Sequence, residues 1–89
     1  MDAGHLDGLD VATLARGATR IWADVLGMHE GQEGATFFDL RGQSISAVRI
    51  LGRLEDEFNV VLDVGFLFDD PDLAAFLNEV VTKASAAHA

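Results

Sequence analysis

Apolar residues recur at helical spacing in three stretches of the chain, and none of these stretches alternates with the period of a β-strand. The stretches cover about Val11–Leu26, about Ser44–Phe58, and a last segment that starts near Asp70. In each, the spacing of three or four residues places the apolar side chains on one helical face. Gly17 interrupts the first stretch and weakens that helix by about 1 kcal/mol relative to alanine. The predicted inward faces are Leu14, Ala18, Ile21, Trp22 and Val25; Ala47, Ile50, Leu51, Leu54 and Phe58; and Leu73, Phe76, Leu77, Val80 and Ala84.

The ends of these helices carry recognisable capping residues. Asp10 precedes the first helix as an N-cap acceptor, and Gly27 follows it as a left-handed C-terminal residue. Asn59 offers the second helix a similar stop. Before the last helix, we expect Asp70 to be the cap and Pro71 the first helical residue.

The connections between the helices are one long loop and one short segment. Residues 28–43 contain three glycines and no clean period, yet they include Phe37, Phe38 and Leu40. Because such side chains favour burial, we expect at least one phenylalanine to pin this loop to the core. In the later segment, Asp63 is placed to cap a single helical turn over 64–68. The pattern therefore predicts an all-α fold, a small antiparallel four-helix bundle with three main helices and one short one.

The length of 89 residues fits one domain. We expect a flexible arm over 1–9, a folded domain over 10–82 and a frayed tail over 83–89. The first ten residues include three aspartates and no basic residue, unlike a secretory signal, and no apolar run reaches a membrane-spanning length. These features predict a soluble cytoplasmic protein, and we expect a monomer. They leave open whether the domain is free-standing or a module of a larger protein.

Composition removes several functional classes. Fifteen acidic and six basic residues give a net charge of −9, so neither nucleic acid nor a membrane surface is expected as a partner. The absence of cysteine excludes a disulfide framework and a cysteine nucleophile. The histidines, His5, His29 and His88, pair with no serine and with no metal-ligand pattern. We therefore expect no enzyme, no catalytic residue and no metal site.

The second long helix carries an additional apolar stripe. Ile45 and Val48 are rotated away from its buried face, Arg49 and Arg53 flank them, and Arg41 lies just upstream. Scattered exposed apolar residues are ordinary on a protein surface, which is the plain interpretation. The alternative is a docking surface, since an apolar patch edged by positive charge suits a protein partner.

Ser44 stands where the long loop becomes the second helix. Its hydroxyl is placed to cap the helix through a backbone N–H group. The same position also suits a phosphate, because the free N–H groups and the helix dipole favour an anion. The residues alone leave both interpretations open.

Residues 37–50, with the sequence FFDLRGQSISAVRI, resemble the phosphopantetheine attachment motif of peptidyl carrier proteins, the thiolation modules of nonribosomal peptide synthesis. That motif has two aromatic residues, an Asp-Leu-Gly-Gly run, one polar residue, the modified serine and a hydrophobic residue. The resemblance extends over about residues 11–81, nearly the whole chain. The matching positions are Phe37, Phe38, Asp39, Leu40, Gly42, Ser44 and Ile45.

The chain departs from this motif in three places. Arg41 stands where the family has its first glycine, which adds charge and removes flexibility. Gln43 replaces the commoner histidine, aspartate or asparagine, and argues against fatty-acid-type carriers, which usually have aspartate there. Residues 35–36 replace an acidic or amide residue. The departures bear on which partners are served, because the acceptor hydroxyl remains.

The resemblance implies an acyl-carrier-protein-like bundle and a phosphoprotein that bears 4'-phosphopantetheine, derived from coenzyme A, on Ser44 rather than Ser46. The arm would carry an aminoacyl, aryl or peptidyl thioester between enzymes of nonribosomal peptide or hybrid polyketide synthesis, as in antibiotic or siderophore biosynthesis. The cargo itself stays open. The rival hypothesis is an unmodified helical protein–protein interaction module in which Ser44 is only a helix cap.

The resemblance also implies a set of partner proteins. They are a phosphopantetheinyl transferase, an adenylating or acyl-loading enzyme, and condensation, ketosynthase, tailoring or thioesterase partners. Magnesium would be needed by the transferase and is not expected on this chain. Val61 and Phe66 are more apolar than is usual for their places and extend the docking patch. The predicted partner-binding residues are Ile45, Val48, Arg49, Arg53 and Phe66.

Overall fold

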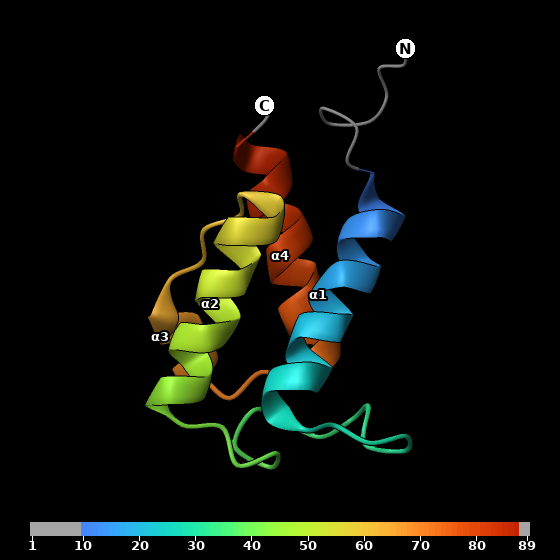
Figure 1. Ribbon diagram of the computed structural model, residues 1–89, viewed down its shortest axis with the longest axis vertical. Helices are drawn as coiled ribbons and strands as arrows, with labels where there is room; N and C mark the ends of the chain where they lie inside the picture. The colour runs from blue at the N-terminus through green and yellow to red at the C-terminus, as the bar shows by residue number, and fades with distance from the viewer. Residues whose placement is uncertain (1–9, 88–89) are drawn as a thin grey trace.

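Three long helices and one short helix make up the part of the chain that the computed structural model describes, residues 10–87. The helices are α1 (Val11–Leu26), α2 (Ser44–Phe58), α3 (Val64–Phe68) and α4 (Leu73–Ala87). Helix α1 packs against both α2 and α4, and the short α3 packs against α2 (Figure 1). Helix α1 runs antiparallel to α2 and to α4, which run in the same direction as each other, and this arrangement of four helices confirms the predicted bundle.

Local capping explains where the first helices begin and end. The Oδ1 atom of Asp10 accepts a hydrogen bond of 2.7 Å from the Thr13 N–H group at the start of α1. Gly27 (φ +67°) and Asn59 (φ +58°) adopt the left-handed conformation after α1 and α2. Asp63 caps α3 by accepting a hydrogen bond of 3.4 Å from an N–H group in its first turn. Four of the five predicted caps are thus confirmed.

The start of α4 differs from the prediction. Asp72, not Asp70, is its N-cap, because the Asp72 Oδ1 atom accepts from the Ala75 N–H group at 2.9 Å. Asp70 instead has a φ of +64° and accepts a hydrogen bond of 2.8 Å from the Phe38 N–H group. Pro71 therefore lies outside the helix. The Asp70 carboxylate therefore binds the long loop and not the start of α4, to which the sequence assigned it.

A single phenylalanine anchors the long loop, as expected. Phe37 is fully buried, and its N–H group donates to the Pro71 carbonyl at 2.8 Å. Its ring centroid lies 6.3 Å from that of Trp22 and 6.3 Å from that of Phe68. The next residue, Phe38, remains exposed. Phe37 thus brings the loop into the core between α1 and the segment that precedes α4, and Met28 and Leu40 pack against the core as well.

The core lies between the three long helices and contains the predicted inward faces. Trp22 and Phe76 stack with their ring centroids 4.8 Å apart. Phe58 packs at the edge of the core, and its ring covers Gly17 of α1 so closely that a Cβ there would lie 2.0 Å from the ring. The buried members of the predicted faces are Leu14, Ala18, Ile21, Trp22, Ala47, Ile50, Leu54, Leu73, Phe76, Val80 and Ala84. The partly buried members are Val25, Leu51, Phe58 and Leu77.

The predicted chain ends fall partly beyond these residues. The arm over 1–9, with His5, and the last two residues, 88–89, with His88, lie outside the described part. Helix α4 continues to Ala87, well into the segment 83–89 that we expected to fray, and Ala84 is buried in the core. None of the helices within residues 10–87 is long and apolar enough to cross a membrane.

Candidate functional site

Ser44 is the first residue of α2, at the end of the bundle where α1 finishes and the long loop lies (Figure 1). The N-cap position belongs to Gln43, whose backbone is extended. Ser44 is exposed, and its hydroxyl makes no hydrogen bond to any residue within 10–87. It is Ser46 that turns back toward the helix start, accepting a hydrogen bond of 3.4 Å from the Gln43 N–H group. The Ser44 hydroxyl is therefore not used as a cap and stands open to solvent.

The backbone around Ser44 suits a phosphate group. The first backbone hydrogen bond of α2 runs from the Ala47 N–H group to the Gln43 carbonyl at 2.9 Å. The N–H groups of Ser44 and Ile45 come before it, so they have no carbonyl partner inside the helix. Their partial positive charge adds to that of the helix dipole. The exposed hydroxyl and these donors together fit a phosphate ester at this position.

Short turns hold the loop segment that leads to Ser44. Thr36 and Asp39 cap each other, since each backbone N–H group donates to the other's side chain at 3.1 Å. The Leu40 N–H group donates to the Thr36 carbonyl at 3.0 Å. The Gly42 N–H group donates to the carbonyl of buried Phe37 at 2.8 Å. The residues before Ser44 are thus fixed relative to the core.

Glycine is required at one of the two positions where the family motif has it. A Cβ atom at Gly42 would lie 2.5 Å from the Phe37 ring, so a side chain there would displace the anchor of the loop. Arg41, at the other position, has a φ of +64°, a conformation that glycine adopts without strain and arginine does not. The sequence indicated lost flexibility at Arg41, and the backbone there is strained as well.

The predicted partner surface is exposed in its main part. The side chains of Ile45 and Val48 are 67% and 65% exposed, and Arg49 is exposed beside them. Three apolar side chains on or just before α3 are also exposed, namely Val61, Val64 and Phe68. Of these the sequence indicated only Val61, because the pattern within a five-residue helix does not show which side faces the core.

Arg53 and Phe66 are placed differently from the rest of this surface. Arg53 donates from Nε to Glu57 Oε2 at 3.0 Å and from Nη1 to Asp24 Oδ2 at 3.3 Å. The hydrogen bond to Glu57, with help from Asp24, raises the pKa of Arg53. Phe66 is partly buried and packs against the core. Both side chains therefore have partners within the domain, and their contact with another protein stays a prediction.

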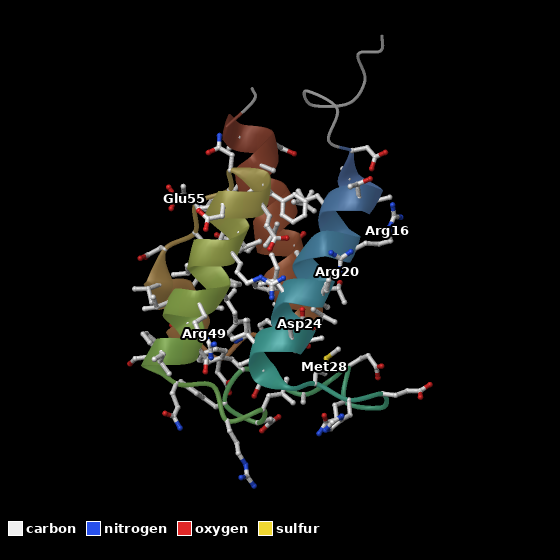
Figure 2. All side chains as sticks on the ribbon, viewed as in Figure 1. Arg16, Arg20, Asp24, Met28, Arg49 and Glu55 are labelled. Carbon is white, nitrogen blue, oxygen red and sulfur yellow. The ribbon has the colours of Figure 1, made fainter. Side chains whose placement is uncertain are left out.

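A shallow groove between α1 and α2 brings acidic and basic side chains together. It is lined by Asp24 and Val25 from α1 and by Arg49, Arg53 and Asp56 from α2. Figure 2 shows Asp24 and Arg49 on the neighbouring faces of these two helices. Within residues 10–87, no group of three histidine or acidic side chains could hold a metal ion.

Comparisons with known proteins match most of this chain. The family described as phosphopantetheine attachment site matches residues 17–80. Phosphinothricin tripeptide synthetase PhsB of Streptomyces viridochromogenes is 39% identical over 66 residues, which are 74% of this chain and 6% of that protein. Surfactin synthase subunit 1 of Bacillus subtilis is 30% identical over 69 residues, which are 78% of this chain and 2% of that protein. No solved structure matches.

The matched region contains the whole motif around Ser44 and all of α2 and α3. The chain spans only a small part of the length of these relatives. The helical bundle and the open serine at the start of α2 agree with the match, which covers well over half of the chain. The chain belongs to the phosphopantetheine attachment family of carrier domains, which carry covalently attached 4'-phosphopantetheine.

Proposed function

We propose that this chain is a peptidyl carrier domain that bears 4'-phosphopantetheine on Ser44 and passes an aminoacyl, aryl or peptidyl thioester between partner enzymes. The observation that carries the proposal is the exposed, unbonded Ser44 hydroxyl at the first position of α2, inside the family motif. When bound, the arm supplies the flexible thiol that a chain without cysteine lacks. The similarity to peptide synthetases favours nonribosomal peptide synthesis, alone or combined with polyketide synthesis.

The chain's own residues hold and present the arm in this proposal. Ser44 supplies the oxygen of the phosphate ester, and the N–H groups of the first turn favour the negative charge of that ester. The anchored loop fixes the point from which the arm starts. Because the arm is tethered there, the cargo is at a high effective concentration at each partner site. No bond of the cargo is made or broken by a side chain of this domain.

The proposed partners dock beside the arm. Ile45, Val48 and Arg49 lie within the first two turns of α2 and are exposed. They would meet the phosphopantetheinyl transferase, the adenylating or acyl-loading enzyme, and the condensation, ketosynthase, tailoring or thioesterase partners in turn. Val61 would extend this surface toward α3. Arg53 would contribute less, since its charge is paired within the domain. The cytoplasmic location and the monomeric state expected from the sequence stay predictions.

The rival function, an unmodified interaction module, needs Ser44 as a helix cap. The cap position is occupied by Gln43, and the hydrogen bond at the helix start goes to Ser46. A free hydroxyl on Ser44 has no structural role in that hypothesis. The carrier is therefore the better-supported function.

Intact mass spectrometry tests the proposal. The protein is incubated with coenzyme A and a promiscuous phosphopantetheinyl transferase, and one phosphopantetheine adduct is expected. Ser44→Ala should give no adduct. Ser46→Ala should still give one, and circular dichroism shows whether that variant keeps its helices. A wild-type protein that gains no adduct would overturn the proposed function.

A further inference from the structure

Three residues other than glycine have a positive φ in the described part of the chain, and in two of them the side chain type or a side-chain hydrogen bond favours that conformation. Asn59 ends α2, and asparagine tolerates the left-handed conformation well. Asp70 accepts a hydrogen bond of 2.8 Å from the Phe38 N–H group, which offsets its strain. Arg41 ends the turn over 37–42, which its own N–H group and that of Gly42 close, but its side chain makes no hydrogen bond or ion pair with any residue in 10–87. The charge of the Arg41 side chain is therefore available to a group outside these contacts.

The strained backbone holds Arg41 in a fixed place. Its N–H group donates to the Phe38 carbonyl at 2.9 Å. On either side, the N–H groups of Leu40 and Gly42 donate to the carbonyls of Thr36 and Phe37. Only the side chain of Arg41 is free to move, and it is exposed to solvent. A long cationic side chain therefore starts from a rigid turn just ahead of Ser44.

Distance along the chain brings this cation to the proposed attachment point. Three peptide units separate Arg41 from Ser44, so their Cα atoms are at most about 11 Å apart. A phosphate on the Ser44 hydroxyl would therefore come within reach of the long arginine side chain. Arg49 lies about 7.5 Å along α2 from Ser44 and about 140° around the helix, so its side chain leaves the helix on a different face. Arg49 also borders the groove that contains Asp24.

A contact between Arg41 and the phosphodiester would offset repulsion between negative charges. The chain has a net charge of −9, and a phosphodiester on Ser44 adds another negative charge. Asp39 lies in the same loop as Arg41, and Asp70 accepts a hydrogen bond from the Phe38 N–H group of that loop. A guanidinium group binds a phosphate through two parallel N–H donors and offsets this repulsion.

We infer that Arg41 binds the phosphodiester that joins the arm to Ser44 and so orients the root of the arm. This inference rests on the proposed function, and it assigns a role to the residue at which the chain departs from the family motif. A glycine at this position would leave the root of the arm without this cation.

A comparison of apo and holo proteins tests the inference without any partner enzyme. Wild type, Arg41→Gln and Arg16→Gln are each prepared before and after loading with coenzyme A and a transferase. Glutamine at position 41 keeps a side chain on the left-handed backbone. The backbone strain is therefore the same in the apo and holo forms of each protein, and it cancels in the change of Tm on loading. Arg16→Gln is the charge-matched control, since Arg16 lies at the far end of the bundle from the start of α2 (Figure 2). The readouts are the melting temperature and the ³¹P resonance of the holo protein.

The expected result is a larger change in Tm on loading for wild type than for Arg41→Gln, by about 2 to 4 °C at low salt. That difference should shrink at about 1 M salt, where charges are screened within about 3 Å. The ³¹P resonance should move in Arg41→Gln and stay in place in Arg16→Gln.

Equal changes in Tm and an unmoved ³¹P resonance in Arg41→Gln would overturn the role of Arg41. Slower loading of Arg41→Gln with these two readouts unchanged would also overturn it, since Arg41 would then act on the transferase. Both results leave the proposed function standing, because an adduct has formed. A failure of wild type to gain any adduct is instead a failure of the proposed function.

Discussion

Helix α2 carries two apolar stripes with the same kinds of residue and opposite surroundings. Ala47, Ile50 and Leu54 are fully buried against the other helices. Ile45 and Val48, on the other side of the same helix, are each about two-thirds exposed, and Arg49 lies beside them. Hydrophobic burial accounts for the first stripe and gives no reason for the second. An apolar stripe that does not stabilise the fold is a candidate for contact with another protein.

The largest effect is expected from a charge placed in the buried stripe. Ile50→Asp removes a fully buried side chain and buries an unpaired carboxylate. The substitution should lower the free energy of unfolding by about 4 kcal/mol or more, which is enough to unfold a domain of this size. Thermal melting followed by circular dichroism measures this. Ile50→Val, the control, should cost only about 1 kcal/mol and remain folded.

Two glycines allow a comparison of the two sides of α2: one lies on α1 and faces the core side of α2, and the other lies on the open side of α2 itself. Gly17 of α1 is covered by the Phe58 ring from the core side of α2, whereas Gly52 has open space around its Cβ position. Gly17→Ala should therefore destabilise by about 1 kcal/mol, because the ring must move. Gly52→Ala should stabilise by about 0.5 to 1 kcal/mol, because alanine favours the helix. Urea unfolding of both variants measures the difference, and equal shifts would contradict this packing.

A smaller effect is expected at Arg53, on the border between the two sides. Arg53→Gln removes the ion pairs with Asp24 and Glu57, which are open to solvent. The loss should be about 0.5 kcal/mol at low salt and less at high salt. The same urea titration at two salt concentrations measures it. A loss that does not depend on salt would show that Arg53 acts through packing and not through charge.

The smallest effect on stability and a clear effect on partners are expected at Val48. Val48→Asp places a charge in solvent, so the free energy of unfolding should stay within about 0.5 kcal/mol of that of wild type. Loading or transfer by a partner enzyme should fall about tenfold, as for a contact residue worth about 1.4 kcal/mol. If Val48→Asp melts as early as Ile50→Asp, the second stripe belongs to the core. If it melts and loads like wild type, partners dock elsewhere.

Local signals account for what the sequence predicted correctly. The bounds of α1, α2 and α3 follow from capping residues and periodicity within a few positions of each end. The start of α4 was predicted wrongly because three aspartates closely precede it, and a loop N–H group 32 residues away selects Asp70. The partners of Arg53 include Asp24, 29 residues away, which helical spacing cannot indicate. Contacts between distant segments thus decided the features that the pattern missed.

The sequence predicted some features of the candidate site and missed others. The motif indicated Ser44, and the structure adds that its hydroxyl makes no hydrogen bond within residues 10–87, while Ser46 bonds to the helix start. The departure at Arg41 was visible in the sequence, but its left-handed backbone was not, because φ depends on the turn around Phe38 and Phe37. The side of α3 that faces solvent also required the packed structure.

Ser44 is the acceptor of the arm in the proposed function, and locating the adduct on the peptide shows whether it is. The holo protein is digested, and the peptide that contains both Ser44 and Ser46 is fragmented in a mass spectrometer. The phosphopantetheine mass is expected on Ser44, with Ser46 unmodified. An adduct located on Ser46 would contradict the account, because the serine that hydrogen-bonds the Gln43 N–H group would then be the acceptor and the exposed one would not.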